Sequence, residues 1–229
     1  MSYLNAQNDA VFERIKNFFD DEDAVEHIQA HTMAFMKLMS YYKCALMEIE
    51  TKLKVLNEEY RLQNDRNPIC SIKTRLKSPG SIKNKLDRRN LPATIDNMEE
   101  YLSDIAGVRV ICSFPDDVYT IADALLKQDD IILLKKKDYI AKPKQNGYRS
   151  LHMIVAIPIF LENEKRMMKV EIQLRTIAMD CWASLEHQLR YKKDYIHDDS
   201  ISKELWDCAR LSEELDLRME NLRKHVLIG

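Results

Sequence analysis

Apolar positions divide this chain of 229 residues into stretches of different period. From about Ala24 to Tyr60 they recur every three or four residues, interrupted only by Thr32, which predicts one long helix or two nearly collinear helices. Residues 201–226 keep a four-three spacing that is typical of a helix packed against another helix. Between these stretches, residues 170–175 alternate apolar and polar side chains, as a strand with one buried face does.

Shorter elements fill the middle of the chain. A polar turn at residues 64–68 ends the first helix, and Ser81 is a suitable N-cap for a short helix that ends before Pro92. Further on we expect, in order, a helix at Asp96–Ile105 with Asp96 as its N-cap and Gly107 as its stop, a strand at Val108–Phe114, a helix at 117–127, a strand at 131–140 and a strand that begins at Leu151. Together with the strand at 170–175, this order predicts a four-stranded sheet flanked by helices, which is a mixed α/β (α+β) fold in one globular unit.

Charge is balanced over the whole chain but not along it. Lys and Arg number 35 against 37 Asp and Glu, so no overall field favours DNA or an anionic membrane as a partner. Locally, residues 73–89 hold seven basic residues and one acid, whereas residues 194–220 hold nine acids and three basic residues. Helix N-termini and Lys/Arg clusters both favour phosphate oxygens, so the basic segment around the Ser78–Gly80 turn could cradle a polyphosphate. A solvated cationic helix is the alternative.

Cysteine and glycine usage narrows the class of protein. The five cysteines form no CxxC pair and sit mostly within apolar patterns, which indicates reduced packing residues and a cytoplasmic protein. The start of the chain has no apolar signal segment, and the longest apolar stretch, Leu151–Leu161, is too short to span a bilayer, so we expect no membrane association. The four glycines cannot form a P-loop or a Rossmann turn, so side chains must hold any phosphates. The His197–Asp198 pair lacks the second histidine cluster of a metal phosphohydrolase.

The segment from Lys142 to Arg175 carries the candidate chemistry. Its loop is basic and aromatic, and its last strand projects a carboxylate, an amide and a guanidinium from one face: Lys142, Lys144, Tyr148 and Arg149 in the loop, and Glu171, Gln173 and Arg175 in the strand. Such groups suit a metal-bound phosphate and a stacked base, although an amphipathic strand beside an ordinary cationic loop fits the same pattern. Asp104, at the predicted helix-to-strand corner, could point a carboxylate into a cleft or could simply cap the helix.

Four stretches together resemble the synthetase domain of the RelA/SpoT homologue family, and they occur in the family's order: DIAGVRV from Asp104, NGYRSLH from Asn146, VEIQLRT from Val170 and AMDCWASLEHQLRYK from Ala178. The chain has no room for the hydrolase and regulatory domains of the long members, so it resembles a small alarmone synthetase of the RelP or RelQ type, with RelP favoured. This implies a helical extension at 1–66, a nucleotidyltransferase-like synthetase domain at 67–193 and a C-terminal helical extension at 194–229.

The resemblance also implies a reaction, in which the β,γ-pyrophosphate of ATP moves to the 3′-hydroxyl of GDP or GTP. Asp104 and Glu171 would hold Mg²⁺, and Glu171 would activate the hydroxyl. The implied ATP-binding residues are Arg75, Lys77, Lys85, Arg88 and Arg109, and the implied GDP or GTP contacts are Lys144, Asn146, Tyr148, Arg149, His152, Gln173 and Glu186. Of these, Tyr148 would stack on guanine, and Arg75 and Arg109 would sandwich adenine.

The sequence is compatible with alternatives for both assembly and function. The resemblance implies a homotetramer in which both flanking helices make subunit contacts, whereas the two helices could instead pack against each other within one subunit. A protein that binds RNA or senses a nucleotide without catalysis could use the same basic segments. However, such a protein would gain nothing from Asp104 and Glu171 in a cationic cleft, because carboxylates repel phosphate unless a metal bridges them.

Overall fold

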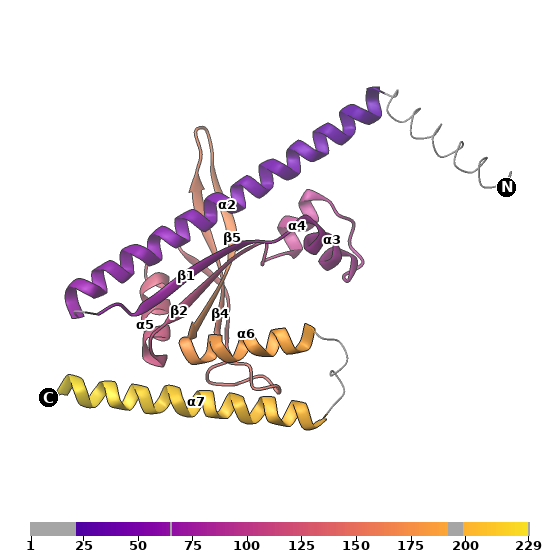
Figure 1. Cartoon of the computed structure of the whole chain (residues 1–229). Helices are drawn as coiled ribbons and strands as arrows, with labels where there is room; N and C mark the ends of the chain where they lie inside the picture. The colour runs from indigo at the N-terminus through magenta and orange to yellow at the C-terminus, as the bar shows by residue number, and fades with distance from the viewer. Residues whose placement is uncertain (1–21, 65, 192–198, 229) are drawn as a thin grey trace. The chain divides into compact units, whose positions relative to one another are not determined.

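The computed structural model of the chain describes residues 22–64, 66–191 and 199–228 (Figure 1). The chain divides into two compact units, residues 1–40 and residues 41–229. The predicted long helix is a single helix, α2 (Glu22–Asn64), which begins in the first unit and continues into the second. The His197–Asp198 pair lies outside the described residues.

A mixed sheet forms the centre of the second unit. Its strand order is β1 (Ile69–Leu76), β2 (Ala106–Cys112), β5 (Lys165–Thr176), β4 (Leu151–Phe160) and β3 (Ile132–Asp138). β2 and β5 are parallel, and the other neighbouring strands are antiparallel. The remaining helices are α3 (Pro79–Asp87), α4 (Ile95–Tyr101), α5 (Pro115–Leu126), α6 (Ile177–Tyr191) and α7 (Asp199–Ile228). The predicted mixed fold is confirmed, but the expected four-stranded sheet is wrong, because β1 is a fifth strand.

Helix boundaries on the basic side of the sheet also differ from the sequence prediction. Ser78, not Ser81, is the N-cap of α3, and its side chain accepts a hydrogen bond from the Ser81 N–H. Thr94, not Asp96, caps α4 in the same way, and Gly107 lies inside β2 instead of ending a helix. α6 is capped by Thr176, whose Oγ1 accepts a hydrogen bond from the Met179 N–H at 3.1 Å.

The two faces of the sheet have different compositions. On one face, alternate residues of the three inner strands are buried together with apolar side chains of α5. The strands contribute Val108, Val110, Leu151, Met153, Val155, Val170, Ile172 and Leu174, and the helix contributes Val118, Ile121 and Leu125. On the other face, paired positions of neighbouring strands are polar: Arg75 and Glu171 flank Gly107, and Gln173 lies between Arg109 and His152. The core and the candidate chemistry therefore lie on opposite sides of the sheet.

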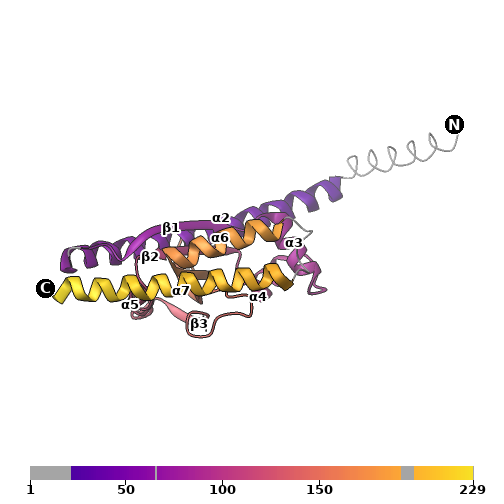
Figure 2. The ribbon, with the colours of Figure 1, turned by 60° about the horizontal axis from the view of Figure 1, so that its bottom comes forward.

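The last two helices, α6 and α7, lie side by side (Figures 1 and 2). The indole N–H of Trp182 in α6 donates a hydrogen bond to the main-chain oxygen of Leu205 in α7. Further along α7, the buried face is polar, because Asp216 accepts a hydrogen bond from Thr176 at 2.7 Å and Glu220 is 5% exposed. The apolar residues of this helix turn outward instead, and those that are exposed include Leu211, Leu215, Met219, Leu222 and Val226.

All five cysteines are free, but the expectation that most of them are packing residues is wrong. Only Cys112 is buried, Cys44 is half-buried, and Cys70, Cys181 and Cys208 are exposed. Cys181 and Cys208 lie on helix surfaces and Cys70 lies on an edge strand. The apolar pattern of the sequence did not indicate that these positions are exposed. Within the described ranges, no helix combines the length and the apolar character that crossing a membrane requires.

Candidate active site

Two carboxylates meet on the polar face of the sheet. Asp104 lies in the turn between α4 and β2, and Glu171 lies in β5. Both side chains line one cavity of about 210 Å³, together with Arg75, Lys77, Arg109 and Gln173. Six of the residues predicted from the sequence therefore share this cavity, although they come from four separate segments of the chain.

Asp104 is held by two lysines. Its Oδ2 lies 2.5 Å from Lys77 Nζ and 2.6 Å from Lys85 Nζ. Burial alone would raise the pKa of Asp104, but the hydrogen bonds from both lysines outweigh this effect and keep the pKa below its usual value. The second oxygen, Oδ1, is buried and has no hydrogen-bond partner among the described residues. An ionised carboxylate with one unsatisfied buried oxygen is suited to a cation.

Glu171 lies beside a histidine and an amide. His152 Nδ1 is 3.8 Å from Glu171 Oε1, and this ring is the main reason that the pKa of Glu171 lies below its usual value. Partial burial and the neighbouring charge of Asp104 act in the opposite direction. Gln173 Nε2 also donates a weak hydrogen bond to Glu171 Oε2 at 3.4 Å. Glu171 is therefore a carboxylate at neutral pH, which allows it to bind a metal or accept a proton.

Cations extend from the carboxylates toward α3. A second cavity, of about 510 Å³, begins at Arg75 and Lys77 and continues along α3, where it is lined by Ser81, Asn84, Lys85, Arg88 and Arg89. Arg75 and Arg88 are exposed. Arg109, with 39% of its side chain exposed, lies 3.4 Å from Asp180 in α6. This arrangement offers several guanidinium and ammonium groups to a long anion such as a triphosphate.

An aromatic and basic network lies on the opposite side of Glu171. The hydroxyl of Tyr148 is 2.8 Å from His152 Nε2 and accepts a hydrogen bond from Arg175 at 2.5 Å. Arg175 also donates to Gln173 Oε1 at 3.1 Å and pairs with Asp180 at the same distance. These contacts connect Tyr148 to Glu171 through His152, so the ring is held at a fixed place beside the carboxylates.

The loop that carries Tyr148 is fixed by α6 and α7. Asn146 donates a hydrogen bond to the buried Glu186 of α6 at 3.1 Å. Gly147 has a φ of +87°, and a Cβ atom at this position would lie 2.4 Å from the Cβ of Ala209 in α7. Only glycine fits there without displacing the loop or the helix. Lys144 lies over the Tyr148 ring, 4.8 Å from its centroid.

Arg149 is placed differently from its neighbours in the loop. Its side chain is 9% exposed, and its guanidinium lies 3.3 Å from Glu213 of α7. Its Nε and Nη1 atoms have no hydrogen-bond partner among the described residues. In this position Arg149 links the loop to α7, and its contact with GDP or GTP stays a prediction.

Comparison with known proteins identifies the family to which the chain belongs. A family model described as a region found in RelA / SpoT proteins matches residues 74–195, which include both carboxylates and every lining residue of the two cavities except Lys73. The chain belongs to the RelA/SpoT family.

Named relatives cover most of this RelA/SpoT protein. GTP pyrophosphokinase YwaC of Bacillus subtilis (strain 168) is 45% identical over 185 residues, which are 81% of this chain and 88% of that protein. The crystal structure of small alarmone synthetase 2 from Bacillus subtilis matches with a TM-score of 0.75 and 42% identity, over 83% of this chain and 98% of that one. Small alarmone synthetase 1 from the same species, bound to its product pppGpp, matches with a TM-score of 0.75 and 32% identity, over 84% and 97% of the two chains.

Some residues of this RelA/SpoT site were missed by sequence reasoning. Lys73 lines the carboxylate cavity, Asp180 anchors both Arg109 and Arg175, and Tyr139 packs edge-on against Tyr148 with ring centroids 6.1 Å apart. The alternation of Lys73, Arg75 and Lys77 was the available signal for the first, and it requires that β1 be recognised as a strand. The other two residues carry no such alternation: Asp180 pairs with Arg109, which is distant in the chain, and Tyr139 meets Tyr148 only when the loop between them is folded.

Proposed function

We propose that this RelA/SpoT protein is a GTP pyrophosphokinase, which transfers the β,γ-pyrophosphate of ATP to the 3′-hydroxyl of GDP or GTP. The observation that carries the proposal is the pairing of Asp104 and Glu171 in one cavity whose walls are otherwise largely cationic. A simple anion-binding site would exclude such carboxylates, because they repel phosphate. The names of the relatives, including a structure bound to pppGpp, support the same reaction.

Asp104 and Glu171 are the residues that would hold Mg²⁺. The buried, unpartnered Oδ1 of Asp104 fits this role, as does the ionised state of Glu171. Mg²⁺ is usually held by one or two carboxylates together with phosphate oxygens and water. When bound, it would neutralise charge on the transferred phosphates and draw electrons from the phosphorus that is attacked.

The acceptor hydroxyl is activated on the β5 side of the cavity. Glu171 accepts the proton of the 3′-hydroxyl, and the 3′-oxygen forms a bond to the β-phosphorus of ATP. The bond between that phosphorus and the oxygen that bridges it to the α-phosphorus breaks, and AMP leaves with this oxygen. Tyr148 stacks on the guanine, and its contact with His152 keeps the bound nucleoside close to Glu171.

The donor is bound on the α3 side. Lys77, Lys85 and Arg88 neutralise the triphosphate, and Arg75 and Arg109 enclose the adenine. Without nucleotide, Lys77 and Lys85 are paired with Asp104. Binding of the donor lets these ammonium groups exchange the carboxylate for phosphate oxygens, so that Asp104 becomes available when the substrate arrives.

Assembly is a further part of the proposal. The outer face of α7 exposes 65% of Leu211, 53% of Leu215 and 59% of Leu222, which is a long apolar stripe for a soluble helix. We expect this stripe to contact other subunits in a homotetramer in the cytoplasm, a compartment whose reducing conditions suit five free cysteines. Leu215→Asp should dissociate the assembly to the 27.0 kDa chain in light scattering, whereas Lys203→Asp on the same helix should not. A monomeric wild-type protein at micromolar concentration would contradict this expectation.

The function is tested by product identity. The full-length protein is incubated with ATP, GDP and Mg²⁺, and the products are separated by anion exchange and identified by mass spectrometry. We expect AMP and ppGpp in equal amounts, and pppGpp when GTP replaces GDP. Binding of RNA or of nucleotides without formation of AMP would instead indicate a regulatory protein that uses the same basic segments.

A further inference from the structure

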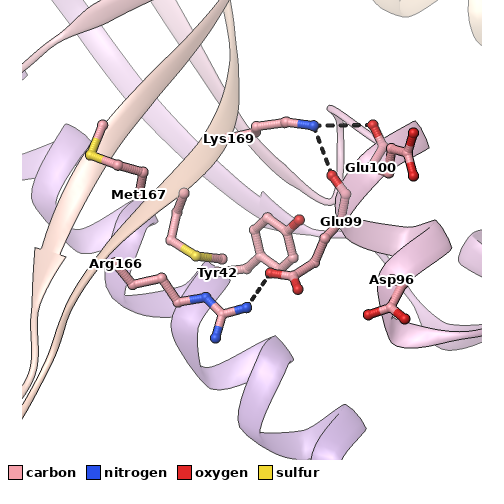
Figure 3. A pocket seen from close by; sticks show the side chains of 8 residues that line it. Tyr42, Asp96, Glu99, Glu100, Arg166, Met167 and Lys169 are labelled. Atoms are coloured by element: carbon pink, nitrogen blue, oxygen red, sulfur yellow. Dashed lines mark hydrogen bonds and ion pairs between the residues drawn. The ribbon is translucent and has the colours of Figure 1, made fainter.

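Lys169 of β5 ties this strand to the end of α4 (Figure 3). Its ammonium group donates hydrogen bonds to the main-chain oxygen of Glu99, 2.7 Å away, and to that of Glu100, 3.1 Å away. The last carbonyl groups of a helix have no partner within the helix, and a cation at this end also interacts favourably with the helix dipole. Lys169 therefore fixes where the end of α4 lies relative to β5.

Two arginines hold the same helix end. Arg166, also in β5, pairs with the Glu99 carboxylate at 2.5 Å (Figure 3). Arg89, which follows α3, donates a hydrogen bond to the main-chain oxygen of Tyr101. A helix of seven residues is too short to be stable by itself, so contacts of this kind determine its position.

The position of α4 in turn determines the position of Asp104. Only residues 101–103 separate Asp104 from Glu100, whose carbonyl group is the nearer in sequence of the two that Lys169 binds. Leu102 and Ile105, on either side of Asp104, are fully buried, and the Ile105 carbonyl accepts a hydrogen bond from the Lys77 N–H of the chain just after β1 at 2.8 Å. Asp104 thus lies in a short segment that is fixed at one end by β1 and at the other by Lys169.

Lys169 and the second carboxylate belong to the same strand. Glu171 is two residues further along β5, so both side chains leave the same face of the sheet. We propose that Lys169 is a positioning residue of the metal site: by holding the end of α4 against β5, it sets the separation between the carboxylates of Asp104 and Glu171. This inference rests on the proposed function, because it concerns the Mg²⁺ site of that reaction. Mg²⁺ requires nearly ideal octahedral geometry, so a small change in this separation weakens its binding.

The test is the affinity of the full-length protein for Mn²⁺, a paramagnetic substitute for Mg²⁺, measured by electron paramagnetic resonance with a non-hydrolysable ATP analogue bound. Lys169→Met should weaken Mn²⁺ binding about tenfold. This is the lower end of the loss of metal affinity that follows when a residue that orients a metal ligand is removed. The Mg²⁺ concentration that gives half-maximal rate should rise to a similar extent, while the KM for GDP stays unchanged. Lys169→Arg keeps a cation at the carbonyl groups and should restore most of the affinity.

Two variants separate positioning from simple stabilisation. Lys165→Met removes a lysine from the same face of β5 whose ammonium lies over the Phe160 ring, and it should leave Mn²⁺ affinity unchanged. Arg166→Met removes the ion pair to Glu99 and should lower the Tm with less effect on Mn²⁺. If Lys169→Met lowered the Tm but weakened Mn²⁺ binding no more than Arg166→Met, the contact would be structural only and the proposal would be wrong.

Failure of this inference can be distinguished from failure of the proposed function. Asp104→Asn removes one of the two proposed metal ligands. It must therefore abolish the signal of bound Mn²⁺ by which the wild type and the Lys169 variants are compared. If the wild-type protein bound Mn²⁺ through Asp104 but formed no ppGpp, the proposed function would fail while the positioning test kept its meaning. A wild-type protein that forms ppGpp, with normal Mn²⁺ affinity in Lys169→Met, would refute the positioning role alone.

Discussion

The two sides of the carboxylate cavity, which we propose bind the acceptor and the donor, differ in how firmly they are built. On the acceptor side, Tyr148 is tied to His152 and Arg175, and its loop is fixed by contacts of Asn146 and Gly147 with α6 and α7. On the donor side, the exposed cations Arg75 and Arg88 extend from the edge of the sheet and from a short helix, and α3 shows no comparable packing around Gly80.

This difference indicates two modes of binding. The proposed acceptor pocket is already arranged without a nucleotide, so we expect little ordering cost to oppose binding there. In the proposed donor cradle, Lys77 and Lys85 are paired with Asp104, so we expect the cradle to be completed only when phosphates replace the carboxylate. Changes of shape should therefore be harmful on the acceptor side, whereas changes of charge should matter more on the donor side.

The largest effect is expected at Glu171, between the two sides. Glu171→Gln keeps the size of the side chain but removes the proposed metal ligand and proton acceptor, so turnover should fall by at least roughly a hundredfold. Binding of GDP, measured by calorimetry, should stay within about threefold of wild type, because the acceptor pocket does not depend on this charge. Production of ppGpp at the wild-type rate would remove Glu171 from the mechanism.

Gly147→Ala tests the rigidity of the acceptor side. The added Cβ must displace either the loop or Ala209, so the KM for GDP should rise on the order of 10- to 100-fold, while the KM for ATP changes little. Circular dichroism and the Tm show whether the fold is kept.

Gly80→Ala is the matched control on the donor side. A Cβ at Gly80 meets no atom within 4 Å, and the residue lies in α3, where alanine is the better helix former. Both KM values should stay at wild-type level. If the two glycine variants behaved alike, the proposed difference between the two sides would be incorrect.

Tyr148→Ala tests the base-stacking surface itself. Stacking contributes on the order of 1–3 kcal/mol per base, so the KM for the guanine acceptor should rise about tenfold or more. Tyr148→Phe keeps the ring and loses only the hydroxyl contacts with His152 and Arg175, so its effect should be clearly smaller. Equal increases in the KM for ATP and in the KM for GDP would show that Tyr148 does not act specifically in the acceptor pocket.

Apart from the Gly80→Ala control, the smallest effect is expected for Arg109→Ala. The side chain is partly exposed, and a cation–π contact at such a site contributes about 0.5–1 kcal/mol. The KM for ATP should therefore rise only about two- to fivefold, with the KM for GDP unchanged. A larger effect on GDP than on ATP would show that Arg109 contacts the acceptor instead.

The sequence predicted the β5 strand of the site but not the β1 strand on the donor side. The alternation of residues 170–175 placed Glu171 and Gln173 on the polar face correctly, because that strand has one fully buried side. The strand β1 was missed, since its position at the sheet edge leaves Lys73, Thr74 and Arg75 exposed and weakens the apolar alternation. Pairing with β2 is what makes this segment a strand.

Contacts between distant segments could not be predicted in either region. Lys77 and Lys85 meet Asp104 only because β1 and the end of α4 are brought together by the sheet and by Lys169. Similarly, the apolar spacing of α7 correctly predicted a helix, but did not reveal that Asp216 and Glu220 would face inward while Leu215 and Leu222 face outward. Their inward position depends on partners such as Thr176 and Arg223.

The central claim is that the cavity transfers a pyrophosphate group as a unit, and tracing of labelled phosphate tests it most directly. The protein is incubated with GDP, Mg²⁺ and ATP labelled either at the γ- or at the α-phosphate. We predict that the γ-label appears in ppGpp, within the pyrophosphate on the 3′-oxygen, and that the α-label appears only in AMP. Release of the γ-label as orthophosphate or free pyrophosphate, with no labelled guanosine nucleotide, would contradict the account.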